Sequence, residues 1–220
     1  MPRTARAIAA GHCYHFINRG NNQLQRFHDP ADYNAFLWLI AEANDHVPMP
    51  IIGACLMPNH VHLVMRPLGD HDLAKWARWL FTAHARRYHK RHKTSGRVWQ
   101  GRFKAFVIEH DTHLLTVLRY VERNALRAKL TTRAENWEWG SLRWRSHAIS
   151  PFHLAPCPVP LPKNWAAFVN APQTPDELEA LRTCVNRQSP FGSPDWVSQK
   201  AAEFGLEQTV APLGRPQKQM

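Results

Sequence analysis

A β-hairpin is predicted by the stretch IIGACLMPNHVHLVMR at residues 51–66. Two extended runs, Ile51 to Met57 and Val61 to Arg66, are separated by a Pro-Asn pair that is typical of a turn. His60 and His62 stand two positions apart in the second run, so both side chains point to the same face of that strand. The hairpin therefore presents two neighbouring imidazoles on one face of a sheet.

The segments on either side of the hairpin predict further strands and helices. Strands are predicted at residues 13–19 and 104–109, and helices are predicted to begin at the cap-and-proline pair Asp29-Pro30, near Leu73 and at Asp111. The order strand, helix, strand, strand, helix, strand, helix is typical of an α+β fold. We expect an antiparallel sheet covered by helices on one side, ferredoxin-like and close to the split βαβ pattern.

The composition changes beyond Arg145, where 11 of the 17 prolines lie. The Pro-rich run that starts at Pro151 predicts a linker, and short helices are predicted to begin at Thr174 and Ser193, the second ending near Gly205. We therefore expect a main domain at residues 1–145 and a Pro-rich C-terminal extension with short helices at residues 146–220.

Positive charge is concentrated in the middle third of the chain. The 220 residues include 28 Lys and Arg against 17 Asp and Glu, a formal net charge of +11, and residues 66–145 hold 18 basic and 7 acidic side chains. The parts before and after this segment are each balanced in charge. A run of like charge is usually a solvated face, but its position beside the residues described below favours a nucleic-acid partner.

The cysteines bear on the cellular compartment. Cys13, Cys55, Cys157 and Cys184 are widely spaced and include no CxxC pair, which argues against a zinc knuckle or a disulfide framework. A reducing cytoplasm fits this usage. The chain has no apolar run that approaches membrane-spanning length, so no membrane partner is expected.

Two groups of residues predict chemistry. The strand histidines His60 and His62 are a platform for a divalent metal ion, although two exposed histidines without a ligand are the competing interpretation. At about 100° per residue, Tyr120 falls nearly opposite the apolar stripe of its helix, on a face shared with Arg123, Asn124 and Arg127. A tyrosine on a polar face is more often a half-exposed surface residue. Beside arginines and an oxygen ligand it is a candidate nucleophile for phosphate.

Several motifs, in this order, resemble the HUH endonucleases, a family named for histidine, hydrophobic residue, histidine, and among them the REP-associated tyrosine transposases. The resembling segments are residues 14–20, 56–63, 98–104, 119–128 and 214–216. The resemblance implies that His60 and His62 bind Mg²⁺ or Mn²⁺, that Asn124 completes the protein ligands and that Tyr120 attacks DNA. It also implies action on single strands beside short palindromic hairpins, leaving a 5′-phosphotyrosine and a free 3′-hydroxyl.

The chain departs from the family pattern at two places. Ala125 stands where the family tends to have proline, and the expected Trp-Ser-Ser-Tyr motif reads Trp139-Gly-Ser-Leu142. Neither departure touches a proposed catalytic group. The third metal ligand has competitors, Glu109, His110 and His113, although the face shared with Tyr120 favours Asn124.

DNA contacts are predicted on cations that are interleaved with aromatic side chains, because phosphate binding and base stacking need both. The predicted DNA-binding residues are Arg86, Arg87, Lys90, Arg91, Lys93, Arg97, Trp99, Arg102, Lys104, Arg123, Arg127 and Arg215. Trp99 and Phe103 have the competing interpretation of anchoring their loop to the core. Arg215 belongs to a Gly-Arg-Pro element of the kind that enters a narrow minor groove, with a disordered basic tail as the alternative.

Together these residues predict a metal-dependent single-stranded DNA endonuclease and strand transferase, working as a monomer or homodimer. No GxxxxGK[ST] motif is present, and phosphotyrosine chemistry conserves the bond energy, so no nucleotide cofactor is expected. The alternatives are another HUH enzyme, either a rolling-circle replication initiator or a relaxase, and a DNA-binding regulator whose catalysis has lapsed.

Overall fold

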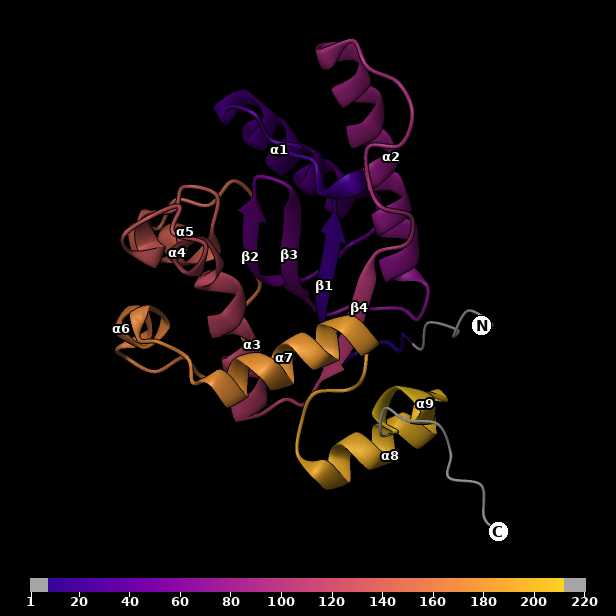
Figure 1. The fold of residues 1–220 in the computed structure, drawn as a ribbon, viewed down its shortest axis with the longest axis vertical. Coiled ribbons are helices and arrows are strands. Elements are labelled where there is room, and N and C mark those ends of the chain that lie inside the picture. Colours follow the sequence, from indigo (N-terminus) through magenta and orange to yellow (C-terminus); the bar gives the residue numbers. More distant parts are fainter. Residues whose placement is uncertain (1–7, 212–220) are drawn as a thin grey trace.

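The computed structural model describes residues 8–211 and is built on a four-stranded antiparallel sheet (Figure 1). The strand order is β2-β3-β1-β4, with bounds Cys13–Arg19 for β1, Ile51–Met57 for β2, His60–Met65 for β3 and Lys104–Ile108 for β4. Because β3 is antiparallel to both β1 and β2, the latter two run parallel with β3 between them. This is the predicted split βαβ arrangement, and the predicted hairpin is confirmed.

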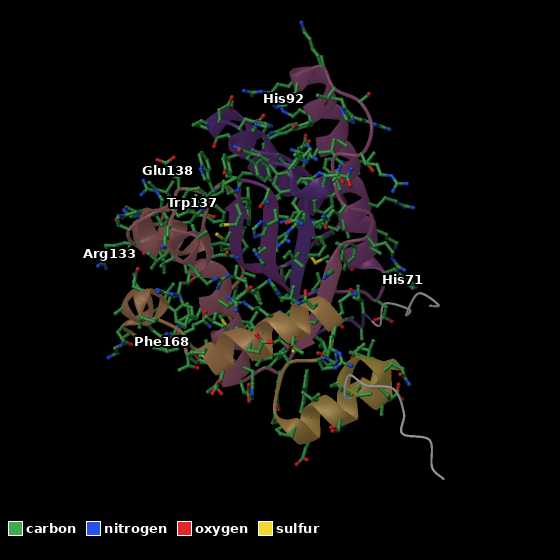
Figure 2. The ribbon with its side chains drawn as sticks, in the orientation of Figure 1. His71, His92, Arg133, Trp137, Glu138 and Phe168 are labelled. Atoms are coloured by element: carbon green, nitrogen blue, oxygen red, sulfur yellow. The ribbon has the colours of Figure 1, made fainter. Side chains whose placement is uncertain are left out.

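Helices α1 (Pro30–His46) and α2 (Asp72–His92) cover one face of the sheet. The predicted cap is present, because the Asp29 side chain accepts a hydrogen bond from the Asp32 backbone N–H. Phe16 from β1 packs with Trp76 from α2, and both side chains are 0% exposed. His71 and His92 mark the two ends of α2 in Figure 2.

The opposite face of the sheet is covered by α3 (Thr112–Glu122) and α4 (Asn124–Arg127), so the expectation of helices on one side is wrong. The strands explain why. Every residue of β2 is buried, and apolar side chains such as Val64 and Phe106 point toward α3. Strands that are apolar throughout, rather than alternating, need cover on both faces. The predicted third helix also divides at Arg123, which separates α3 from α4.

The C-terminal extension packs on the sheet. The Pro-rich run does not behave as a linker, because the Ala155 backbone N–H donates to the Ile51 carbonyl at 2.8 Å, along the edge strand β2. Further along, Phe191 forms a bridge with Ile108 of β4. The remaining helices are α5 (Ser141–His147), α6 (Trp165–Asn170), α7 (Pro175–Arg187), α8 (Pro194–Phe204) and α9 (Glu207–Val210), with short 3₁₀ turns η1 (Asn21–Gln23) and η2 (Ala134–Asn136).

The two helix starts that were predicted in the extension are confirmed. Thr174 and Glu177 form a complete capping box at α7, and α8 begins at Pro194 and ends before Gly205, whose φ is +63°. In Figure 1, α7 lies beside α3 and β4. Between residues 8 and 211 there is no helix that is both long and apolar enough to span a bilayer.

A buried carboxylate ties the extension to α3. Glu122 is 2% exposed, and it accepts hydrogen bonds from Ser141 Oγ at 2.5 Å, Trp165 Nε1 at 2.7 Å and Arg145 Nε at 3.2 Å. Ser141 belongs to the segment that departs from the family motif, and its hydroxyl also accepts from the Ala54 N–H of β2 at 2.9 Å. The departure therefore leaves a structural serine in place.

Candidate active site on the α3 face of the sheet

The two predicted histidines lie side by side at one end of β3. His60 is paired with Arg19 of β1 and His62 with Ile17, and the imidazole centroids are 4.8 Å apart. Each ring is held through Nδ1: that of His60 lies 2.6 Å from Asn59 Oδ1, and that of His62 lies 2.8 Å from His15 Nε2. The two Nε2 atoms make no hydrogen bond among the described residues and are left for a ligand.

These imidazoles are neutral at physiological pH. Burial lowers the pKa of His60 to about 3 and the pKa of His62 well below its usual value, and the nearby Arg19 and Arg127 act in the same direction. A neutral imidazole offers a nitrogen lone pair, which is the form that binds a metal ion. An outer hydrogen bond on Nδ1 is also the arrangement that orients metal-ligating histidines.

Tyr120 lies on α3 directly above the histidines. Its ring centroid is 6.0 Å from that of His62 and 6.1 Å from that of His15. The Arg127 guanidinium carbon is 4.1 Å from the centre of the tyrosine ring. The predicted polar face of α3 is not open to solvent, because Tyr120 is only 7% exposed. The sequence pattern did not predict this burial, because the residues that cover Tyr120 come from the C-terminal extension, far along the chain.

Asn124 completes the predicted group. It is 4% exposed, its Oδ1 accepts a hydrogen bond from Arg127 Nη2 at 3.0 Å, and its buried Nδ2 has no partner among the described residues. Burial lowers the pKa of the Arg127 guanidinium, but the group remains a cation at neutral pH. Asn124 and Arg127 therefore bring an amide oxygen and a positive charge to one place.

These side chains share a cavity of about 300 Å³. Its lining residues are Ile17, Arg19, His60, His62, Tyr120, Asn124, Arg127, Arg182, Val185 and Asn186. The lining includes three arginines and no acidic side chain. Neutral imidazoles and an amide oxygen fit a divalent metal ion, and the guanidinium groups fit a phosphate. The cavity thus combines a phenol, two neutral imidazoles with an amide, and three guanidinium groups.

The competing metal ligands lie elsewhere. His110 Nε2 accepts from the Cys13 N–H at 2.8 Å, and His113 Nδ1 lies 2.8 Å from Asp111 Oδ1. Cys13 and Arg19 are the two ends of β1, about 20 Å apart at the rise of an extended strand. Glu109, Asp111 and His113 do form a mixed cluster, as do His28, Asp32 and His92 between α1 and α2, but none of these residues lines the Tyr120 cavity.

The predicted DNA-binding residues separate into two groups. Arg86, Arg97 and Arg102 line a second cavity of about 500 Å³ between α2 and the 96–103 loop. Lys104 lies with Arg19 and Arg102 in a smaller cavity that shares Val185 and Asn186 with the Tyr120 cavity. Arg87, Lys90 and Lys93 stand on or just after the end of α2.

Other predicted DNA contacts are engaged within the protein. Arg91 pairs with Asp29 at 2.6 Å and Asp32 at 3.2 Å, and Arg123 donates to the carbonyls of Val169 and Asn170. Trp99 is 7% exposed and donates from Nε1 to His84 Nδ1 at 3.1 Å, which is the environment of a loop anchor. Phe103 is 7% exposed and packs 4.6 Å from Phe16, centroid to centroid. Arg215 lies outside the described residues.

Four residues of the site were not singled out from the sequence: His15, Arg19, Arg182 and Asn186. For His15 a signal exists, because it alternates with Ile17 on one face of β1, but its meeting with His62 depends on the pairing register of two strands. Arg19 is placed by the same register. Arg182 and Asn186 arrive from α7, and no local pattern indicates which part of the sheet that helix covers.

Comparisons with known proteins bear on the family and the fold. Residues 9–124 match a family model described as "Transposase IS200 like". A Haemophilus influenzae protein named as a REP-associated tyrosine transposase is 27% identical over 122 residues, which are 50% of this chain and 69% of that protein. A solved structure of a REP-associated tyrosine transposase bound to a REP hairpin has 15% sequence identity and a TM-score of 0.57, covering 73% of this chain and 95% of that one. This last similarity bears on the fold alone.

Proposed function

The chain belongs to the IS200-like transposase family, and from that premise we propose that it is a metal-dependent single-stranded DNA endonuclease and strand transferase acting beside palindromic hairpins. One observation carries the proposal. Tyr120 shares a cavity with His60 and His62 and with three arginines, without an opposing carboxylate. A tyrosine in such a cavity has an anionic phosphate as its natural reaction partner.

The proposed reaction exchanges one phosphodiester for another. The Tyr120 oxygen forms a bond to phosphorus and the bond from phosphorus to the 3′ oxygen breaks. The phenol loses its proton, and the departing 3′ oxygen gains one. A 3′-hydroxyl of a second strand reverses the exchange and joins the strands, so bond energy is conserved and no nucleotide cofactor is needed. Arg127, beside both Tyr120 and Asn124, is placed to stabilise charge on the phosphate.

His60 and His62 are the proposed holders of Mg²⁺ or Mn²⁺, with Asn124 as the third protein ligand. When bound, the ion neutralises charge on the phosphate and stabilises the leaving oxygen. The residues fit this role, because both imidazoles are neutral, both are oriented through Nδ1, and both Nε2 atoms are without a partner among the described residues. His15 acts as a positioning residue for His62.

The proposed DNA surface continues from the Tyr120 cavity to the end of α2. The small cavity at Arg19, Arg102 and Lys104 leads toward the one lined by Arg86 and Arg97. A duplex stem would use the phosphate-binding cations, while a single strand enters the Tyr120 cavity.

Covalent trapping tests the proposed function. The probe is a labelled single-stranded oligonucleotide carrying a palindromic hairpin from the protein's own genome, incubated with Mn²⁺ and resolved under denaturing conditions. We expect the wild type to form a DNA adduct and Tyr120→Phe to form none while retaining hairpin affinity, because only the attacking oxygen is lost.

The three other tyrosines, Tyr14, Tyr33 and Tyr88, supply matched phenylalanine controls that should all retain the adduct. An adduct formed by Tyr120→Phe would assign the nucleophile to another residue. Hairpin binding without any cleavage by the wild type would instead identify a DNA-binding regulator.

A further inference from the structure

The Tyr120 cavity has a wall that lies outside the family-matched segment. Residues 9–124 supply Ile17, Arg19, His60, His62, Tyr120 and Asn124, and Arg127 follows just after them, whereas α7 supplies Arg182, Val185 and Asn186. None of the residues proposed as catalytic or metal-binding from the sequence lies in the extension. Its packing against α3 instead brings two polar side chains to the reacting centre.

The packing of α7 explains which residues face the cavity. Leu181 is 0% exposed and Cys184 is 8% exposed, and both belong to the core that includes α3. Arg182 and Asn186 are exposed and stand four residues apart, one helical turn, so they share a face. The capping box at Thr174 and Glu177 fixes the start of this helix. Helix α7 therefore presents an arginine and an amide to the cavity.

Arg182 differs from its neighbours in its contacts with the described part of the chain. Arg187 on the same helix donates to the Gln208 and Ala211 carbonyls, and Arg119 on α3 lies 3.8 Å from Glu177. Arg182 makes no hydrogen bond or ion pair among the described residues. Its positive charge is one of the influences that lower the pKa of Arg127. Three arginines that converge without a carboxylate repel one another, and a bound anion removes that cost.

We propose that Arg182, with Asn186 beside it, binds a phosphate of the DNA strand that enters the Tyr120 cavity. The C-terminal extension then supplies part of the active site. This inference rests on the proposed function for its ligand. An arginine has the donor geometry for a phosphate, and an adjacent amide adds a donor without adding charge.

The test measures DNA binding and not cleavage, so its result does not depend on which residue is the nucleophile. All proteins carry Tyr120→Phe. The probes are a hairpin oligonucleotide with its flanking single strand and the same hairpin with the flank removed. Arg182→Ala is compared with Arg143→Ala, an arginine on α5 that lines neither the Tyr120 cavity nor the α2 cavities.

We expect Arg182→Ala to weaken binding of the flanked probe about tenfold, as for loss of one charge-assisted hydrogen bond. The slope of log affinity against log salt should fall by about 0.7, one phosphate contact on a single strand. Arg182→Ala should bind the hairpin without a flank as tightly as the protein that keeps Arg182. Arg143→Ala should leave the affinity for both probes unchanged. Arg182→Lys should restore the salt slope, because it keeps the charge.

Neutral methylphosphonates placed singly along the flank then locate the contact. Replacement at the phosphate that Arg182 binds should lower the DNA affinity of the protein that keeps Arg182. It should not lower the affinity of Arg182→Ala, because both changes remove the same contact. Equal losses in both proteins at every position would overturn the proposal. Unchanged affinity of Arg182→Ala for the flanked probe would overturn it as well. An adduct formed by Tyr120→Phe would defeat the proposed nucleophile and leave this binding result interpretable.

Discussion

His15 is a residue whose importance appears only in three dimensions. It is 0% exposed, its Nε2 lies 2.8 Å from His62 Nδ1, and its Nδ1 has no partner among the described residues. Burial lowers its pKa to about 3, so it stays neutral and able to accept the His62 Nδ1 proton. A hydrogen bond donated by His62 Nδ1 to this acceptor leaves the His62 Nε2 lone pair available to the proposed metal ion.

Replacing His15 with alanine should raise the metal concentration needed for cleavage by about 10- to 100-fold, the usual effect of removing an outer-shell partner. The measurement is a Mn²⁺ titration of single-turnover cleavage, accompanied by direct Mn²⁺ binding in the absence of turnover. His113→Ala, in the cluster outside the Tyr120 cavity, is the control and should leave the titration unchanged. Equal metal requirements for the two variants would show that His15 does not orient the site.

Replacing the proposed metal ligands His60 and His62 should have a larger effect than replacing His15. His60→Ala combined with His62→Ala should abolish metal-dependent cleavage, since two of the three proposed protein ligands are lost. Hairpin binding, measured in EDTA, should persist. Cleavage by the double variant that still responds to added Mn²⁺ would place the metal site elsewhere in the protein.

At the scale of elements, α3 depends on later segments of the chain that pack against it. Glu122 is held by Ser141, Arg145 and Trp165, from two later segments of the chain. Glu122→Ala should destabilise the protein by about 3–5 kcal/mol, because it leaves the partners of a buried charge unpaired. Denaturant unfolding measures this, with exposed Glu138→Ala as the matched control, for which we expect a change within about 0.5 kcal/mol. Similar stabilities for both variants would mean that the contacts of Glu122 contribute little.

The hydrogen bond that anchors the loop after α2, from Trp99 to His84, should make the stability of the protein depend on pH. Burial lowers the pKa of His84 to about 3 from a usual value of 6.5, while its Nδ1 accepts from Trp99 Nε1. As pH falls, His84 therefore becomes protonated in the unfolded chain at a higher pH than in the folded protein. The stabilising contribution is complete above about pH 6.5 and is lost progressively toward pH 3.

His84→Gln keeps an acceptor for Trp99 but does not titrate, so its melting temperature should fall less steeply than that of the wild type between pH 7 and pH 4. The wild type retains acid sensitivity from the other buried histidines in either case. If the melting temperatures of the two proteins fell equally with pH across this range, the role of His84 would be contradicted.

The elements that could be predicted from the sequence are those with local signals. The Pro-Asn turn, the Asp29 cap and the Thr174 capping box each depend on residues within a few positions of one another. The placement of α3 on the second face of the sheet had a signal too, because residues 51–57 are apolar throughout. The packing of the Pro-rich run against β2 had none, since prolines indicate an extended chain but not the surface on which it lies.

At the scale of the whole molecule, the site could be predicted only where a motif carries it. His60, His62, Tyr120 and Asn124 were predicted, and the structure brings all four to one cavity. Arg19 and His15 depend on strand register, and Arg182 depends on a helix that begins more than 50 residues after α3 ends. Long-range pairing leaves no trace in the spacing of one sequence.

The basic C-terminal end is tested as a unit. Arg215→Ala with Lys218→Ala should weaken hairpin binding and lower the salt slope by about 0.9 for each cation that contacts a duplex phosphate. Single-turnover cleavage at saturating DNA should persist. Paired salt titrations measure the first effect. Identical slopes for variant and wild type would show that this segment does not contact DNA, and loss of cleavage at saturation would give it a part in the active site.

The Tyr120 cavity is lined by residues that lie far apart in the chain, from Ile17 in β1 to Asn186 in α7. During synthesis at about 5–20 residues per second, the segment from Asn124 to Asn186 is made over several seconds, after Tyr120 and the two histidines are already in the chain. A nascent chain still on the ribosome therefore carries the motif without the finished cavity. The cavity is therefore complete only after α7 has been translated, well after the residues that form its other walls.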